Sequence, residues 1–316
     1  MPSHVPVLPG AVRSLLAPAP FAGWIVDGTV GAGGHAASLL AAAGPEARLL
    51  ALDRDETALA IARDALAPFT GRVSFVHAPF SRMAEAARDA GVSSVRAILL
   101  DLGVSSMQLD RAERGFSFLR DGPCDMRMDA TGGGRTAYDL LRDESEETLA
   151  AIFRDWGEER YAARAARAVK TALAEGRLPD STTALADLLD KALGGRKGRL
   201  HPATRCFQAL RLAVNRELDE LEKVLPQALD LLAPGGRLGV ISFHSLEDRI
   251  VKNFFRLHEG ETVSLPQGGT RWAGAEPRGE RATKKPVVPD EAECAANPRA
   301  RSAKLRVFEK AREGAA

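Results

Sequence analysis

Three aspartates are the residues of this sequence best placed to do chemistry. Asp27, Asp53 and Asp101 each end a short apolar run that reads as a buried strand. In an open parallel sheet the carboxyl ends of the strands face one crevice, and ligands bind there. A carboxylate at such a strand end can accept hydrogen bonds from both hydroxyl groups of a ribose. We therefore expect the three carboxylates to line one cofactor site.

A glycine-rich turn follows the first of these strands. Gly31, Gly33 and Gly34 have no Cβ atom, so the backbone can turn sharply and a ligand can approach it closely. The helix expected from about His35 directs its free N–H groups and the positive end of its dipole toward the same point. The same glycines would also suit a tight turn that binds nothing.

The spacing of these residues fits two classes of cofactor. Gly31-x-Gly33-x-x-Ala36 matches the dinucleotide pattern, which is a weak signal by itself. Asp27-x-x-x-Gly31-x-Gly33 matches the acidic residue and glycine turn of S-adenosylmethionine (SAM) methyltransferases. Because Asp53 could hold the ribose in either class, the first third of the chain predicts an adenosine-containing cofactor without choosing between them.

Alternating strands and helices are predicted to position these groups. Strands are expected over 24–27, 49–53, 73–77 and 95–101, with helices between them, and this order favours a parallel α/β sheet. Phe80 follows the third of these strands. It could cover an adenine ring there, or it could pack in the core.

The alternation of strand and helix breaks after Asp101. A long irregular segment comes first, and the pattern is then helical from 137 to 194, which suggests a helical insert. The expected domains are therefore the first part of a cofactor-binding domain over 1–110, a helical insert over 111–204, and the second part of the cofactor-binding domain over 205–316.

The last third of the chain is expected to complete the sheet. One long helix is predicted from about Pro202 to Leu232, followed by a strand that ends at His244. Asp248 lies in the first turn of the next predicted helix, where the helix dipole favours a carboxylate. The segment that ends at Phe308 is interpreted as an edge strand.

The overall composition excludes several classes of protein. The 43 Lys and Arg residues balance 42 Asp and Glu residues, so a nucleic-acid surface must be local. Two segments are locally basic: 196–205, and 271–306, which surrounds Trp272. The three cysteines lack metal-ligand spacing, so we expect no metal and a reducing compartment. With no leader pattern and no apolar run of membrane-spanning length, a cytoplasmic protein is expected.

Six blocks of the sequence resemble the signature blocks of one family. This is the bacterial SAM-dependent methyltransferase family that methylates N4 of a cytosine in the decoding centre of small-subunit ribosomal RNA. The blocks are Asp101–Asp110 (DLGVSSMQLD), Arg114–Phe118 (RGFSF), Asp121–Asp129 (DGPCDMRMD), His201–Arg211 (HPATRCFQALR), Ser242–Asp248 (SFHSLED) and Asn297–Ser302 (NPRARS). Met107 and Cys124 depart from the family pattern, which has proline and an apolar residue such as leucine there.

The resemblance implies a class I methyltransferase fold, a Rossmann-like doubly wound sheet, with a helical insert that recognises the substrate. It implies SAM as methyl donor and small-subunit ribosomal RNA, or the 30S particle, as partner, with no membrane association and a homodimer left open. Carried over block by block, it implies that SAM is contacted by Gly33, Gly34, His35, Asp53, Phe80, Asp101 and Gln108. The pattern of the turn itself adds Asp27 and Gly31 to this set.

Methyl transfer to an exocyclic amine needs hydrogen-bond acceptors beside that amine. The lone pair of the cytosine amine is delocalised, so the enzyme must align the nitrogen and accept its protons as charge develops. We expect Asp101, or the hydroxyl groups of Ser105 and Ser106, to be these acceptors. His244 and Asp248 are second candidates for taking up the proton, although a buried histidine with a structural role would fit equally well.

The target base must leave its stack to reach the methyl group. Phe116 and Phe118 could stack on it, although Phe118 could equally pack in the core. Asp125, Arg127 and Asp129 are expected to form an ion-pair network that shapes the pocket. The insert and the two basic segments would hold phosphate groups.

Two other functions fit parts of the sequence. A nicotinamide-dependent dehydrogenase would need a histidine or a Tyr–Lys pair beside the cofactor, and no such pair is evident, since Tyr138 and Tyr161 are the only tyrosines. An RNA-binding protein with an inactive cofactor site fits poorly with an intact set of strand-end aspartates.

Overall fold

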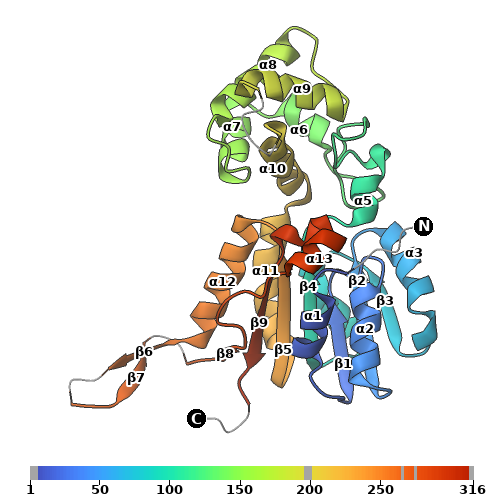
Figure 1. The fold of residues 1–316 in the computed structure, drawn as a ribbon, viewed down its shortest axis with the longest axis vertical. Helices are drawn as coiled ribbons and strands as arrows, with labels where there is room; N and C mark the ends of the chain where they lie inside the picture. Colours follow the sequence, from blue (N-terminus) through green and yellow to red (C-terminus); the bar gives the residue numbers. More distant parts are fainter. Residues whose placement is uncertain (1–5, 196–200, 265–266, 274–275, 313–316) are drawn as a thin grey trace. The chain divides into compact units, whose positions relative to one another are not determined.

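The computed structural model describes residues 6–195, 201–264, 267–273 and 276–312. The chain divides into two compact units, whose elements Figure 1 labels. The sheet unit comprises Met1–Gly103 and Leu218–Ala316, and the helical unit comprises Val104–Glu217. In the described part of the chain, no helix is both long enough and apolar enough to cross a membrane.

The helical unit is larger on both sides than the insert expected over 111–204. Val104 and Leu109 pack against its core before the expected start, and Cys206 and Phe207 lie buried in that core after the expected end. The boundaries at 110 and 204 are corrected accordingly, because apolar side chains beyond them belong to the helical core. The functional roles expected for the units stay predictions.

The sheet unit is built on a mixed sheet. Among the described residues it has seven strands in the order β3-β2-β1-β4-β5-β9-β8. The first five are mutually parallel, as the sequence predicted. They are β1 (Gly23–Asp27), β2 (Ala47–Asp53), β3 (Val73–His77), β4 (Val95–Asp101) and β5 (Leu232–Ser242). Since β1 lies between β2 and β4, the carboxyl ends of these three strands are neighbours.

The C-terminal strand is an internal strand, so the prediction of an edge strand was wrong. β9 (Lys304–Lys310) runs antiparallel to β5 on one side. On its other side it pairs with β8 (Gly279–Arg281), which forms the actual edge. A strand of three residues has too little alternation to be seen in a sequence pattern. Apart from this sheet, β6 (Glu261–Ser264) and β7 (Thr270–Ala273) form an antiparallel hairpin.

Both faces of the sheet are buried. Ile25 and Leu49 face one apolar cluster, whereas their neighbours Val26 and Leu50 face another. This alternation explains why the strands read as continuous apolar runs. The first face is covered by α1 (Pro9–Leu16), α2 (Gly34–Ala43) and α3 (Glu56–Ala65). The second is covered by α4 (Met83–Asp89), α11 (Glu217–Leu231) and α12 (Ser245–Glu259), and the short α13 (Glu291–Ala296) precedes β9.

The helical unit has its own apolar core, formed by side chains spaced three and four residues apart along its helices. The largest fully buried side chain in it is Phe153. Its helices are α5 (Ser106–Asp110), α6 (Ala137–Asp143), α7 (Glu146–Asp155), α8 (Ala162–Ala174), α9 (Thr182–Leu193) and α10 (Ala203–Asn215).

The single helix predicted from Pro202 to Leu232 is in fact two helices. Arg216, between α10 and α11, adopts a left-handed conformation with φ of 51° and ends the first helix. The preceding residue, Asn215, is 3% exposed. Its amide oxygen accepts from the Met128 N–H (2.8 Å), and its amide nitrogen donates to the Met126 carbonyl (2.7 Å). The last residue before the break thus bonds to a loop that is distant in the sequence. The local helical pattern does not reveal this contact.

This contact leads to a prediction for stability. Replacing Asn215 by alanine leaves the Met128 N–H and the Met126 carbonyl buried without their partner. We expect Asn215→Ala to lower the free energy of unfolding by about 2–3 kcal/mol in urea denaturation. The matched control is Asn253→Ala on the exposed side of α12, which should change it by less than about 0.5 kcal/mol. Equal effects of the two substitutions would contradict the structural role of Asn215.

Candidate functional site

Backbone N–H groups tie the ends of β1, β2 and β4 together in the sheet unit. The Asp101 N–H donates to the Thr29 hydroxyl oxygen (2.7 Å), and the Thr29 N–H donates to Asp27 Oδ1 (3.1 Å). On the other side of β1, the Gly31 N–H donates to Asp53 Oδ2 (2.8 Å). The structure thus brings together the three strand-end carboxylates that the sequence singled out. Thr29, which links two of these strands, was not among the predicted residues.

The turn after β1 requires glycine at its end. Gly33 has φ of 84°, a left-handed conformation, and it is the N-cap of α2. No side chain caps this helix, so its first N–H groups face the strand ends without a side-chain acceptor from the cap residue. Gly34 begins α2, as predicted to within a residue, and a Cβ there would lie 2.6 Å from Cγ of Pro6. The turn is therefore both tight and closely packed.

The strand-end carboxyl groups are unusually weak acids. Burial, together with the charges of Asp27 and Glu247, raises the pKa of Asp101 to about 8. Burial likewise raises the pKa of Asp27 to about 7, with the charge of Asp53 adding to the effect of burial. The pKa of Asp53 is raised to about 6 by burial, against the hydrogen bonds from the N–H groups of Asp55 and Gly31. Among the described residues, the charge of Arg54 lowers the pKa of Asp53, but no cation is among the causes that act on Asp27 or Asp101. A positively charged ligand would relieve the excess of negative charge that remains.

Asp101 has a free acceptor and a histidine neighbour. Its Oδ1 is buried and accepts no hydrogen bond from the described residues. Its Oδ2 lies 3.7 Å from Nε2 of His35, in the first turn of α2. A buried carboxylate oxygen without a donor is costly unless a ligand supplies one. This oxygen fits a group that donates hydrogen bonds or carries positive charge.

Phe80 lies close to the end of β1. It begins a short 3-10 helix, Phe80–Arg82, and is partly buried against the core. A Cβ atom built at Gly28 would lie 3.3 Å from Cβ of Phe80 and 2.6 Å from Cδ2 of Leu100. Cβ of Phe80 is therefore close to Gly28, the residue that follows Asp27.

The candidates at the end of β5 have structural partners. His244 is the N-cap of α12, and its Nδ1 accepts from the Glu247 N–H (3.4 Å) while its Nε2 lies 3.1 Å from Glu247 Oε1. Glu247 in turn is 2% exposed, and its carboxylate accepts from the Phe243 N–H (2.8 Å). Glu247 was not among the predicted site residues. The structure shows that it also raises the pKa of Asp101.

Asp248 is held by cations from β9. Its carboxylate accepts from Nε (2.7 Å) and Nη2 (3.2 Å) of Arg306, and Nζ of Lys304 lies 3.6 Å away. Burial raises the pKa of Asp248, but the hydrogen bonds and charges of Arg306 and Lys304 outweigh burial and lower it overall. A carboxylate engaged in this way joins α12 to β9 and is poorly suited to take up a proton.

Ser105, Ser106 and Gln108 belong to the helical unit. Ser105 is the N-cap of α5, and its hydroxyl accepts from the Gln108 N–H (3.2 Å). The Gln108 side chain accepts from the Ser105 N–H (3.0 Å), which completes a capping box. Ser106 is the first residue of α5. The Ser105 hydroxyl and the Gln108 carbonyl oxygen each keep acceptor capacity beyond the cap.

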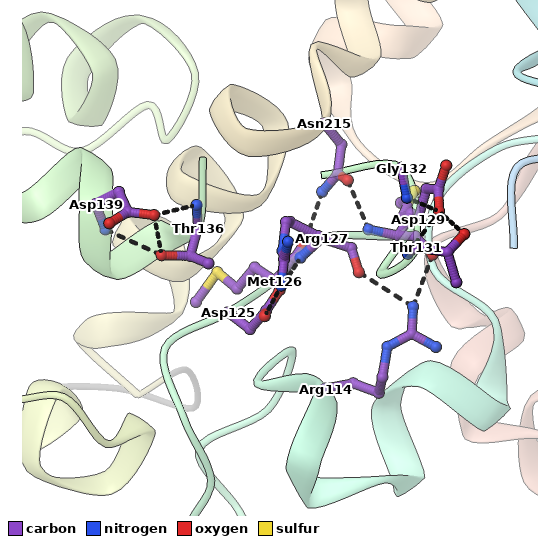
Figure 2. Close-up of polar contacts among 11 residues, drawn as sticks. Arg114, Asp125, Met126, Arg127, Asp129, Thr131, Gly132, Thr136, Asp139 and Asn215 are labelled. Carbon is purple, nitrogen blue, oxygen red and sulfur yellow. Dashed lines mark hydrogen bonds and ion pairs between the residues drawn. The ribbon is translucent and has the colours of Figure 1, made fainter. Parts of the chain in front are cut away.

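Figure 2 shows how the loop after α5 is held within the helical unit. Arg127 forms a bidentate pair with Asp125, whose nearest oxygens lie 2.9 and 2.7 Å from it. Nη2 of Arg114 donates to the carbonyl oxygens of Arg127 (3.1 Å) and Met128 (2.7 Å). Oδ1 of Asp129 accepts from the N–H and the hydroxyl of Thr131, and the charge of Asp129 helps to raise the pKa of Arg127. Asp125 and Arg127 of the expected network are thus paired directly, and Asp129 acts on Arg127 through its charge.

The remaining candidates are partly in the core and partly outside the description. Phe116 is buried in the helical core, and the ring of Phe118 packs 4.8 Å from those of His201 and Phe207. Residues 196–200 of the basic loop and the side chain of Trp272 lie outside the described residues. Within the described part of the chain, no cluster of three or more His, Cys, Asp or Glu is arranged to hold a metal ion.

The raised pKa values predict how stability depends on pH. These carboxyl groups titrate near 3.8 when unfolded but at about 6 to 8 when folded, so the folded state binds more protons in between. The free energy of unfolding of the cofactor-free protein should therefore fall as the pH rises through this range. Asp101→Asn, which imitates the protonated acid, should reduce that fall by more than about 1.4 kcal/mol, the equivalent of one pKa unit.

Urea unfolding of both proteins between about pH 5 and pH 8.5 measures this difference. Asp248→Asn is the control, because the folded pKa of Asp248 is lowered and its contribution has the opposite sign. Over this pH range Asp248 is ionised in both the folded and the unfolded state, so that variant should be destabilised by an amount that does not change with pH. A profile of Asp101→Asn parallel to that of the unmodified protein would exclude the assigned pKa shift.

Comparison with known proteins supplies the family. The ribosomal RNA small subunit methyltransferase H of Methylobacterium nodulans is 48% identical over 98% of this chain and 91% of that protein. The protein of the same name from Geobacter sulfurreducens is 49% identical over 98% of this chain and 99% of that protein. A solved rRNA methylase from Streptococcus thermophilus aligns with a TM-score of 0.42 at 11% identity, over 96% of this chain and 94% of that one.

The sequence profile described as the MraW methylase family matches residues 1–311. This match confirms the methyltransferase resemblance and SAM as the methyl donor, and it decides against a nicotinamide cofactor. The doubly wound α/β sheet and the glycine turn at the strand ends agree with it. This chain is a methyltransferase and belongs to the MraW methylase family.

Proposed function

We propose that this chain transfers a methyl group from SAM to N4 of cytosine 1402 in small-subunit ribosomal RNA. The names of the relatives, which span nearly the whole chain, support a ribosomal RNA substrate. The observation in the structure that carries the proposal is the buried Asp101 Oδ1, an acceptor without a donor beside two further carboxylates. The substrate form, free RNA or 30S particle, a homodimer and a cytoplasmic location are parts of the same proposal.

The residues at the strand ends suit the donor molecule. SAM supplies an electrophilic methyl group on a positively charged sulfonium. Asp53, whose two oxygens each accept one backbone hydrogen bond, keeps lone pairs for the two ribose hydroxyls. The N–H groups at the start of α2, with Gly31, Gly33, Gly34 and His35, would hold the methionine end.

Further contacts complete this proposed cofactor site. Phe80 would lie against the adenine, Asp27 would fix the turn through Thr29, and Gln108 would contribute from the helical unit. The excess of negative charge at the strand ends favours a ligand with a net positive centre. A nicotinamide dinucleotide, which carries two phosphate charges, would meet repulsion at the same place.

Asp101 is the residue that we propose as acceptor of the amine protons. An ionised carboxylate beside the cytosine amine stabilises the positive charge that develops on nitrogen as the new bond forms. The hydroxyl groups of Ser105 and Ser106 are the alternative acceptors. His244 and Asp248 are weaker candidates, because the first caps α12 and the second is paired with Arg306. No covalent intermediate with the protein is needed.

The assignment of Asp53 predicts a change in cofactor affinity. Asp53→Asn removes the charge that strengthens hydrogen bonds to the ribose, so SAM should bind about 10- to 100-fold more weakly in titration calorimetry. Asp55→Asn, two residues away, is the matched control. Asp55 caps α3 through its side chain, a role that asparagine also fills, so its SAM affinity should be unchanged. Tight binding of NAD in place of SAM would refute the cofactor assignment.

The assignment of Asp101 predicts the pH dependence of the reaction. Because only the ionised carboxylate accepts a proton, kcat/KM for methyl transfer should rise with pH and level off below about 8, the pKa of this group without SAM, since the sulfonium charge lowers that pKa. Initial rates with a small-subunit RNA fragment, measured with excess SAM, give the profile. Asp101→Asn should reduce the rate at least 100-fold, and its residual rate should lack this rise.

Mass spectrometry of the product tests the position of the methyl group. Ribosomal RNA from cells that lack the protein should lose one N4-methylcytosine, and the purified protein should restore it. A methyl group on another base, or on a ribose hydroxyl, would refute the proposed substrate atom while leaving the family assignment intact. SAM binding without any transfer to small-subunit particles would favour an RNA-binding role.

A further inference from the structure

Two arginines on the surface of the helical unit lack carboxylate partners. Arg160 and Arg164, in and just after the connection from α7 to α8, are both exposed. Among the described residues, neither is within ion-pair distance of an Asp or Glu side chain. Other exposed arginines on these two helices differ, since Arg154 pairs with Asp155 (2.8 Å) and Arg167 pairs with Glu146 (3.3 Å). In the part of the chain that the structure describes, the positive charges of Arg160 and Arg164 are therefore not neutralised by a carboxylate.

A tyrosine holds the two guanidinium groups together. Tyr161 is 45% exposed, and the guanidinium carbons of Arg160 and Arg164 lie 5.6 and 5.5 Å from the centroid of its ring. The negative face of an aromatic ring attracts cations at this distance, so the Tyr161 ring keeps both guanidinium groups near it. The three residues form what we call the arginine–tyrosine surface.

The backbone beneath this surface is rigidly built. A Cβ at Gly157 would lie 2.6 Å from the carbonyl oxygens of Phe153 and Arg205, so this connection packs directly on the first turn of α10. Glu158 adopts a left-handed conformation with φ of 50°. The buried carboxylate of Glu159 accepts from the Tyr161 N–H (2.8 Å) and fixes the start of α8. Arg205, whose backbone carbonyl lies against this connection, is itself exposed and belongs to the basic segment noted in the sequence.

We infer that the arginine–tyrosine surface binds the phosphate backbone of the RNA substrate, outside the site of methyl transfer. This inference rests on the proposed function, because it takes the substrate to be RNA. Guanidinium groups bind phosphate through paired hydrogen bonds, and a preformed pair loses little side-chain freedom on binding. The chain as a whole is almost neutral, so a polyanion needs such local positive charge.

The test compares two double variants of equal charge. Arg160→Ala with Arg164→Ala should weaken binding of a small-subunit RNA fragment about tenfold at 0.1 M salt. It should also lower the slope of log affinity against log salt by about 1.4 to 1.8, the value for two lost phosphate contacts. Arg154→Ala with Arg167→Ala removes two arginines from the same two helices, but ones that carboxylates already neutralise. This control should change the affinity less than threefold.

Two single variants and one conservative pair separate the contributions. Arg160→Lys with Arg164→Lys should keep most of the salt slope. Tyr161→Phe should bind like the unmodified protein, whereas Tyr161→Ala should weaken binding about threefold because the guanidinium groups are no longer held together. Circular dichroism and SAM affinity, which these surface substitutions should leave unchanged, verify that each variant is folded.

The outcomes distinguish this inference from the proposed function. If both double variants lose RNA affinity equally, only net charge matters and the inference is wrong. If binding to naked RNA is unchanged while binding to the assembled 30S particle is lost, the surface meets an acidic protein and the inference is also wrong. If the unmodified protein binds the RNA through these arginines but methylates no cytosine, the inference stands and the proposed function fails.

Discussion

The hydrogen bond from the Asp101 N–H to the Thr29 hydroxyl is the constraint on which the candidate site depends. Together with the bond from the Gly31 N–H to Asp53, it joins three strand ends through neutral backbone groups rather than through cations. Asp248, which joins α12 to β9, differs in that Arg306 supplies a cation to its carboxylate. Asp101 has no such cation among the causes that act on it, and burial together with the charges of Asp27 and Glu247 raises its pKa.

The buried carboxylates at the strand ends lower the stability of the folded protein, and they do so where a bound ligand can restore it. Buried like charges disfavour the folded state when they ionise, and protonation or a bound cation removes that cost. A donor with a sulfonium centre and an ammonium group therefore stabilises the folded protein by its charge as well as by its shape. In the proposed reaction, the ionised form of Asp101 both attracts the cationic donor and accepts a proton from the amine. Cofactor binding and catalysis therefore depend on the same ionisation.

The sequence predicted the features that depend on local pattern. The apolar runs, the strand-end aspartates and the helix after Gly33 follow from periodicity and glycine geometry, and the structure confirms their places. The sequence pattern did not reveal features that depend on partners distant in the chain. Asn215 ends a helix because of a loop 87 residues away, and Asp248 is paired by an arginine 58 residues further on. His244 sits at a strand end like a catalytic base, yet its contacts with Glu247 make it a helix cap.

The charges of the two units suggest why one protein needs both. A site lined with carboxylates attracts a cationic donor, but for the same reason it repels the phosphates of RNA. The attraction for a polyanion must then come from elsewhere on the chain, and in the helical unit Arg160 and Arg164 have no carboxylate partner among the described residues. On this argument the donor is bound by the strand-end carboxylates of the sheet unit, and the RNA by these local cations of the helical unit. The two affinities can therefore be varied separately, which a single mixed site would not allow.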